Sequence, residues 1–139
     1  MASGTTPSEV PSYLSDYSEL YRRDPHAAAL KWFSGARFGL FLHYGLYSIL
    51  GEGEWVMYHR KMPPGEYGKL AERFRPEKFD ADFITDLALD AQMSYVNLVS
   101  CHHDSFCLWD SKIESFNSVA TSAHRDLVGE LAEACGEKG

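Results

Sequence analysis

The stretch YVNLVSCHHDSF (Tyr95–Phe106) decides how this chain can fold. Its first half is short and mostly apolar, which is typical of a buried strand. Its second half places two histidines, His102 and His103, where that strand ends. In a parallel α/β fold, ligands bind at the carboxyl ends of the strands. Two adjacent imidazoles there are better explained by hydrogen bonds to a polar ligand, or by a metal, than by core packing.

A second strand is predicted from FGLFLHYG (Phe38–Gly45), a nearly continuous apolar run bounded by glycines. Such a run is typical of a parallel strand that is covered on both faces. His43 lies at its carboxyl end. Taken alone, His43 is more easily read as a core histidine. Beside a second strand that also ends in histidine, a binding role is favoured.

Helices are predicted before, between and after these strands. Asp24 is placed to cap a helix that Pro25 begins and Gly35 ends. Asp80 caps a second helix, in which apolar residues follow the three-and-four spacing. A third helix is expected over residues 124–138, with Gly139 just past its end. The order helix, strand, helix, strand, helix indicates α/β architecture.

Two strands cannot close a barrel, because an eight-stranded barrel takes about 250 residues and this chain has 139. We therefore expect the N-terminal portion of a (β/α)8 TIM-like barrel, incomplete in this chain. Residues 1–23 are expected to form a flexible N-terminal arm, since the first dozen are rich in Ser, Thr, Pro and Gly. Residues 24–139 are expected to form the N-terminal segment of this barrel domain.

Composition excludes several classes of protein. The net charge of −7 argues against nucleic-acid binding, which needs a basic face. No apolar run approaches the roughly 18 residues that cross a bilayer, so no membrane role is expected. The start of the chain does not resemble a signal peptide, so the chain is expected to be cytoplasmic by default, or mature after processing. Three cysteines, an odd number, predict free thiols.

Several separate motifs then resemble glycoside hydrolase family 29, the α-L-fucosidases. They keep the family's order and spacing over roughly residues 31–139, which makes the resemblance more specific than any lone motif. The matching segments are Trp32-Phe33, Ala36–Ser48, Gly53-Glu54-Trp55 with Tyr58, Phe79-Asp80-Ala81, His102-His103-Asp104 with Phe106, Leu108–Ser111 and Arg125–Val128.

The resemblance implies a (β/α)8 catalytic barrel that removes terminal α-L-fucose from glycans by a retaining double displacement. His43 is similar to a histidine that binds fucose hydroxyls. Glu54 and Trp55 look like the pair that contacts the sugar from the loop after the first strand, and His102 and His103 like the pair that grips further hydroxyls. Imidazole can donate and accept at once, which suits vicinal hydroxyls. A tryptophan face suits the methyl group of a 6-deoxy sugar.

The family's nucleophile, an aspartate, and its acid/base lie on later strands, which places both past Gly139. We therefore expect no catalytic residue in this chain. Separately, we expect no cofactor and no metal. Cys101 and Ser105 depart from the lysine and glycine common in the family, and Tyr44 and His124 depart from tryptophan and glycine. The changes at 101 and 105 flank the histidine pair, so they could alter the shape of the loop or the subsite preference.

Alternatives remain open at the level of sequence. Without the resemblance, Glu54 is more easily explained as a loop charge and Trp55 as a lid over the core. Asp104 is expected to orient a neighbouring histidine or to cap a turn rather than to act in catalysis. A zinc site built from the Cys101–Cys107 segment is disfavoured, because neighbouring strand residues point to opposite faces. The expected partner is a fucosylated glycan or oligosaccharide. The alternatives to an enzyme segment are a non-catalytic fucose-binding fragment, or one half of a split barrel completed by a homo-oligomer or a complementing C-terminal half.

Overall fold

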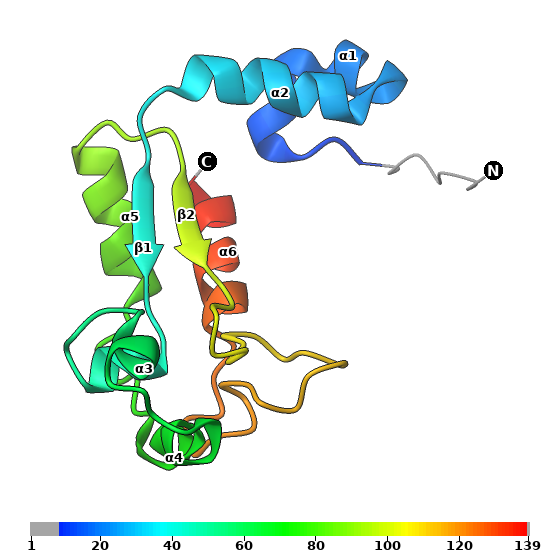
Figure 1. Ribbon diagram of the computed structural model, residues 1–139. Helices are drawn as coiled ribbons and strands as arrows, with labels where there is room; N and C mark the ends of the chain where they lie inside the picture. Colours follow the sequence, from blue (N-terminus) through cyan, green and yellow to red (C-terminus); the bar gives the residue numbers. More distant parts are fainter. Residues whose placement is uncertain (1–8, 139) are drawn as a thin grey trace.

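The computed structural model describes residues 9–138 of the chain (Figure 1). Its elements are, in chain order, η1 (Ser12–Tyr17), α1 (Ser18–Arg23), α2 (Pro25–Ala36), β1 (Leu40–His43), η2 (Leu46–Ile49), α3 (Val56–His59), α4 (Pro64–Gly68), η3 (Lys69–Arg73), α5 (Ala81–Asp90), β2 (Val96–Val99) and α6 (Leu127–Lys138), where η is a 3-10 helix. Helices and strands alternate as the sequence predicts, which makes the chain an α/β structure.

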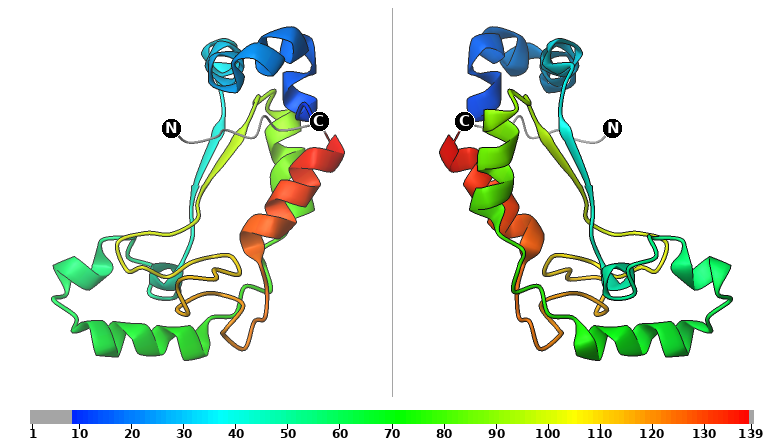
Figure 2. Two further views of the ribbon diagram at one scale, coloured as in Figure 1. Left: turned by 90° about the vertical axis from the view of Figure 1, so that its right-hand side faces the viewer. Right: turned by 90° about the vertical axis from the view of Figure 1, so that its left-hand side faces the viewer.

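The strands β1 and β2 form a parallel pair, with Leu40 opposite Val96 and His43 opposite Val99. The helices α5 and α6 cover one face of this pair (Figure 2). The other face is open, and Phe41 is 62% exposed on it. The expectation that the first strand is covered on both faces is therefore wrong for the described residues. A continuous apolar run indicates that both faces of a strand suit burial, but it does not show which part of the structure covers the second face.

The N-terminal segment differs from the expected flexible arm. Residues 1–8 of that arm lie outside the described residues, but residues 12–23 are helical. Leu14 and Tyr21 are 1% and 8% exposed and pack against Ala28 of α2. A few well-spaced apolar side chains thus anchor a segment whose polar composition suggested an arm.

The helix ends confirm the predicted caps at two places. The Asp24 carboxylate accepts a hydrogen bond from the Ala27 amide, and Asp80 accepts one from Phe83, both at 2.9 Å. Gly35, however, does not end α2, which runs to Ala36. The first residues predicted for the last helix are not helical either. There His124 has a φ of 49°, and α6 begins three residues later.

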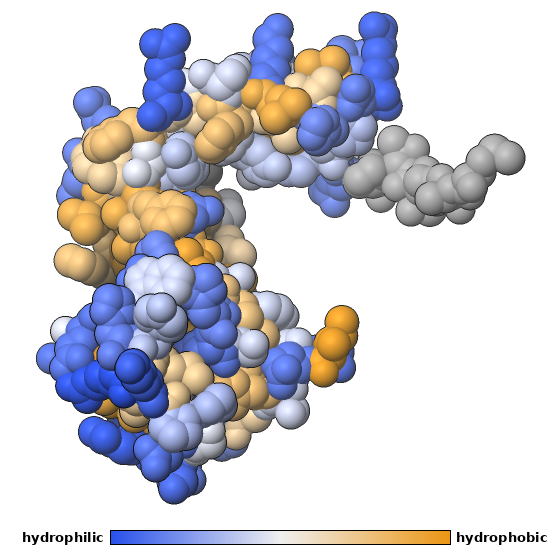
Figure 3. Space-filling view, in the orientation of Figure 1, coloured by the Kyte–Doolittle hydropathy of each residue, from blue (hydrophilic) through white to orange (hydrophobic). Residues whose placement is uncertain are grey.

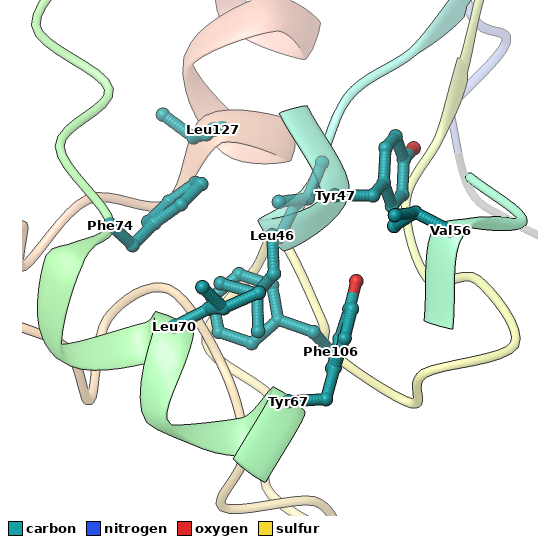
Figure 4. Close-up of a cluster of buried hydrophobic side chains, with 9 residues drawn as sticks. Leu46, Tyr47, Val56, Tyr67, Leu70, Phe74, Phe106 and Leu127 are labelled. Atoms are coloured by element: carbon teal, nitrogen blue, oxygen red, sulfur yellow. The ribbon is translucent and has the colours of Figure 1, made fainter. Parts of the chain in front are cut away.

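A buried cluster lies beside the carboxyl ends of the two strands (Figure 4). It joins the segments that follow β1 to those that follow β2, because Leu46 lies in the same cluster as Phe106 and Leu127. The rings of Phe74 and Phe106 meet edge to face at a centroid distance of 5.1 Å. The cluster consists of Leu46, Tyr47, Val56, Tyr67, Leu70, Phe74, Phe106, Leu108 and Leu127.

The outer surface is uneven in polarity. Apolar side chains gather over the part of the surface around the strands and α5, whereas the lobe of loops is more hydrophilic (Figure 3). Within residues 9–138, no helix combines the length and the apolar character that a membrane crossing requires.

The buried cluster should dominate stability. Replacing Leu46, which is fully buried, by Ala should lower the free energy of unfolding by about 2–5 kcal/mol, because it removes packed methyl groups and leaves a cavity. The matched control is Leu30→Ala on α2, where the side chain is 55% exposed. Urea unfolding of both variants measures the difference. Equal midpoints for the two would contradict this account of the core.

Candidate functional site

The histidines meet at one edge of the strand pair. His43 is the last residue of β1, and the chain leaves β2 at Val99 to reach His102 three residues later. The rings of His43 and His102 lie at a centroid distance of 5.5 Å. His43 is exposed, so it is not a core histidine. The parallel register therefore brings together two side chains that are far apart in sequence.

The loop after β1 adds a carboxylate and an aromatic face. Trp55 directly precedes α3, and its ring lies 4.4 Å from the ring of His103, centroid to centroid. His103 in turn lies 4.4 Å from His102. Trp55 is 48% exposed and is not a lid over the core. The structure thus brings Glu54, Trp55 and the three histidines of the strand ends into one cluster.

Three of these side chains, His43, Glu54 and His102, are close enough to bind one small polar group together. One ligand atom each from His43, Glu54 and His102 lies within 4.8 Å of the other two. A hydroxyl oxygen bonded to two groups at about 2.8 Å places those groups about 4.6 Å apart. Tetrahedral zinc draws its ligands to about 3.3 Å from one another. These three side chains would have to move closer together to bind a metal, whereas a hydroxyl group that bridges them fits the present spacing.

Two polar atoms beside this set have no hydrogen-bond partner among the described residues. They are the buried Tyr47 hydroxyl and the buried Nδ1 atom of His102. Their rings lie 5.8 Å apart, edge to face. Burial raises the pKa of Tyr47 to about 12, helped by the negative charges of Asp104 and Glu54. The phenol therefore keeps its proton at neutral pH and remains a hydrogen-bond donor.

Sequence reasoning missed Tyr47 as a site residue. The signal was its position two residues past Gly45, directly after a strand that ends in histidine. A Cβ atom on Gly45 would lie 2.8 Å from the Tyr47 ring, so a side chain there would push the ring away. The glycine allows the ring to pack under the strand end.

Asp104 holds the histidine loop in shape. One carboxylate oxygen accepts a hydrogen bond from the Tyr67 hydroxyl at 2.8 Å, and the other accepts one from the Phe106 amide at 3.0 Å. Burial and this bond to Asp104 raise the pKa of Tyr67 above its ordinary value. Ser105 sits in the left-handed region, with a φ of 62°. Asp104 therefore caps a turn, as expected.

Burial lowers the pKa of His102, and the neighbouring rings of His103 and His43 lower it further. His102 is consequently neutral at pH 7. A neutral imidazole both donates and accepts a hydrogen bond. Together with a carboxylate and an exposed indole face, this arrangement suits a ligand that carries several hydroxyls on an apolar frame.

A cluster of this kind, at the carboxyl ends of parallel strands in an α/β fold, is suited to bind a small ligand rich in hydroxyls. Comparison with known proteins agrees: the profile of the family Alpha-L-fucosidase matches residues 8–139. The chain belongs to this family, which in solved structures is labelled GH29.

Individual relatives support the same assignment. Tissue alpha-L-fucosidase of Bos taurus is 34% identical over 143 residues, covering 91% of this chain and 30% of the relative. A crystal structure of an alpha-L-fucosidase GH29 from Bacteroides thetaiotaomicron has a TM-score of 0.76 at 35% identity, covering 80% of this chain and 27% of that one. Alpha-L-fucosidase AlfC from Lactobacillus casei in complex with alpha-L-fucose product has a TM-score of 0.73 at 40% identity, covering 78% and 37%. The chain spans about a quarter to a third of the length of the curated relatives that it matches.

The lowered pKa of His102 predicts a pH-dependent stability. The unfolded chain takes up a proton near the ordinary pKa of 6.5 and the folded chain only at lower pH, so stability falls as pH drops below about 6.5. Urea unfolding at a series of pH values should show this loss, and His102→Asn should flatten it. His26→Asn, at an exposed position on α2, is the control. An unchanged pH profile in His102→Asn would contradict the assignment of the loss to His102.

Proposed function

We propose that the protein carrying this chain is an α-L-fucosidase, a glycosidase that removes terminal α-L-fucose from glycans, and that this chain supplies part of the sugar-binding pocket. The observation that carries the proposal is the convergence of His43, Glu54, Trp55 and the His102–His103 pair. These side chains come from two strand ends and one loop, and they form a single hydroxyl-binding wall. The family supplies the substrate class.

Each side chain has a role that its chemistry supports. Neutral His102, with His43 and the Glu54 carboxylate, binds sugar hydroxyls. Trp55 presents its exposed face to the C–H surface and methyl group of the sugar, and His103 stands against that indole. Together they hold the reacting carbon in one place, which is how positioning groups lower a reaction barrier.

The reaction itself needs a pair of carboxyl groups. A retaining glycosidase places them about 5–5.5 Å apart, one as nucleophile and one as acid/base. Asp104 does not suit either role, because both of its oxygens already accept hydrogen bonds from Tyr67 and Phe106. Glu54 belongs to the hydroxyl-binding set. The family resemblance places the catalytic pair on later strands, so we assign it to polypeptide other than these 139 residues.

We further propose that β1 and β2 open a (β/α)8 barrel. The support is the parallel pairing, the helical cover on one face and the exposed Phe41 on the other, where a barrel would place its interior. Phe41 lies on the same face as His43, with ring centroids 5.1 Å apart. The remaining strands could belong to the same polypeptide or to a complementing chain; co-purification of a second polypeptide with this one would distinguish the two.

The first test removes the histidines. In the protein that carries this chain, His102→Ala and His103→Ala should each lower kcat/KM for an aryl α-L-fucoside by about 10- to 100-fold, because sugar hydroxyls lose their partners. His26→Ala on α2 is the control and should leave the rate unchanged. Hydrolysis at the normal rate by both site variants would refute the proposed pocket. If no protein containing the chain hydrolyses the fucoside but it still binds L-fucose, the non-catalytic alternative is favoured.

A second test concerns Trp55. L-Fucose differs from L-galactose by a methyl group in place of a hydroxymethyl group, so an indole face at that position favours fucose. Trp55→Ala should reduce the ratio of the two affinities by about tenfold, measured by calorimetric titration of both sugars. Trp109→Phe, at a position outside the cluster, serves as the matched aromatic control. An unchanged ratio in Trp55→Ala would show that the methyl group is recognised elsewhere.

A further inference from the structure

Two cysteines flank the histidine loop at its base. Cys101 and Cys107 lie opposite each other in an isolated antiparallel bridge, and their Sγ atoms are 3.7 Å apart. The adjacent bond runs from the Leu108 amide to the Ser100 carbonyl at 2.8 Å. The two cysteines therefore occupy a non-hydrogen-bonded position of the bridge, where opposing side chains approach most closely.

This placement meets the geometric requirement of a disulfide. Cα atoms in a non-hydrogen-bonded antiparallel pair lie about 4.5 Å apart, and disulfides span about 4.4–6.8 Å between Cα atoms. The sulfur atoms must close by about 1.7 Å to reach the bond length of about 2.05 Å. Rotation of two short side chains can supply that movement while the backbone keeps its place.

We propose that Cys101 and Cys107 form a dithiol that is oxidised to an intrachain disulfide by a low-molecular-weight disulfide such as glutathione disulfide. The two thiols differ in access: Cys101 is exposed and Cys107 is buried. Cys135, on α6, is half-buried and is not part of the bridge. The expectation of free thiols holds for the structure as it stands, and the proposal concerns its oxidised form.

The reaction proceeds by two exchanges. The exposed Cys101 thiolate attacks glutathione disulfide, forms a mixed disulfide and releases one glutathione thiolate. Cys107 then loses its proton, attacks the Cys101 sulfur and releases the second glutathione thiolate. Two protein thiols are oxidised to one disulfide, and one glutathione disulfide is reduced to two glutathiones. Burial raises the pKa of Cys107 to about 11, which makes it the slower nucleophile and supports this order.

The bond would brace the loop that carries His102, His103 and Asp104. In the reduced chain this loop is held at Asp104 by Tyr67 and the Phe106 amide. A covalent tie at its base acts independently of those bonds. Formation of this bond can be measured whether or not the protein binds fucose.

The test is a redox titration of the full chain. The chain is equilibrated in glutathione buffers, quenched with acid, alkylated and digested with trypsin. The tryptic peptide of residues 79–112 contains both Cys101 and Cys107, and the peptide of residues 126–138 contains Cys135. We expect peptide 79–112 to lose the mass of two hydrogens and to resist alkylation, while Cys135 stays alkylated. The oxidised chain should melt several degrees higher than the reduced chain.

Controls distinguish a disulfide that the folded structure favours from one that forms only because the two cysteines are close in sequence. The same titration in concentrated urea should give an equilibrium constant about tenfold or more below the native value. Cys101→Ser, at an exposed position, should abolish the loss of two hydrogens, and Cys135→Ser should leave it intact. A native constant no higher than that in urea, a persistent glutathione adduct on Cys101, or a dimer linked through Cys101 would each overturn the proposal.

Discussion

The parallel pairing of β1 with β2 sets His43 opposite Val99, and the other features of the site depend on this register. A slip by one residue would turn the His43 side chain to the face covered by helices. The chain leaves β2 at Val99 and needs three more residues to place His102 beside His43. Backbone hydrogen bonds between two four-residue strands thus determine which imidazoles meet.

The strand ends alone would not hold the loops in place. Ordering a loop residue costs about 1–2 kcal/mol of backbone entropy, and a fully buried large apolar side chain returns about 1.5–3 kcal/mol. Leu46 and Tyr47 after β1 share one cluster with Phe106 and Leu108 after β2, and Leu127 of α6 closes it. The loops that carry the site are therefore held by this buried cluster. Tyr47 belongs to the cluster and to the site, because its ring is buried in the cluster and lies beside the ring of His102.

Local patterns in the sequence were enough to predict the strands, the capping aspartates and the histidines at the strand ends, whereas Glu54 and Trp55 were assigned to the site only through the family resemblance. Asp24 and Asp80 act within one turn of the chain, so their roles can be read from neighbouring residues. Leu14 and Tyr21 could not be read in this way, because their burial depends on Ala28 in another helix. The Cys101–Cys107 bridge was missed for a similar reason: its register depends on a turn in which Ser105 adopts a left-handed conformation.

The side chains of the cluster are largely exposed, which limits what this chain could do alone in the proposed sugar pocket. A small-molecule pocket commonly buries about 70–90% of its ligand, yet His43, Trp55 and His103 all remain exposed in this chain. The described residues therefore form one wall of the proposed pocket, and this wall alone cannot exclude water from a bound sugar. Electrostatic stabilisation of a transition state is strongest where water is excluded. A second wall is thus needed for chemistry as well as for affinity, and the open face that carries Phe41 beside His43 is where it would meet this one.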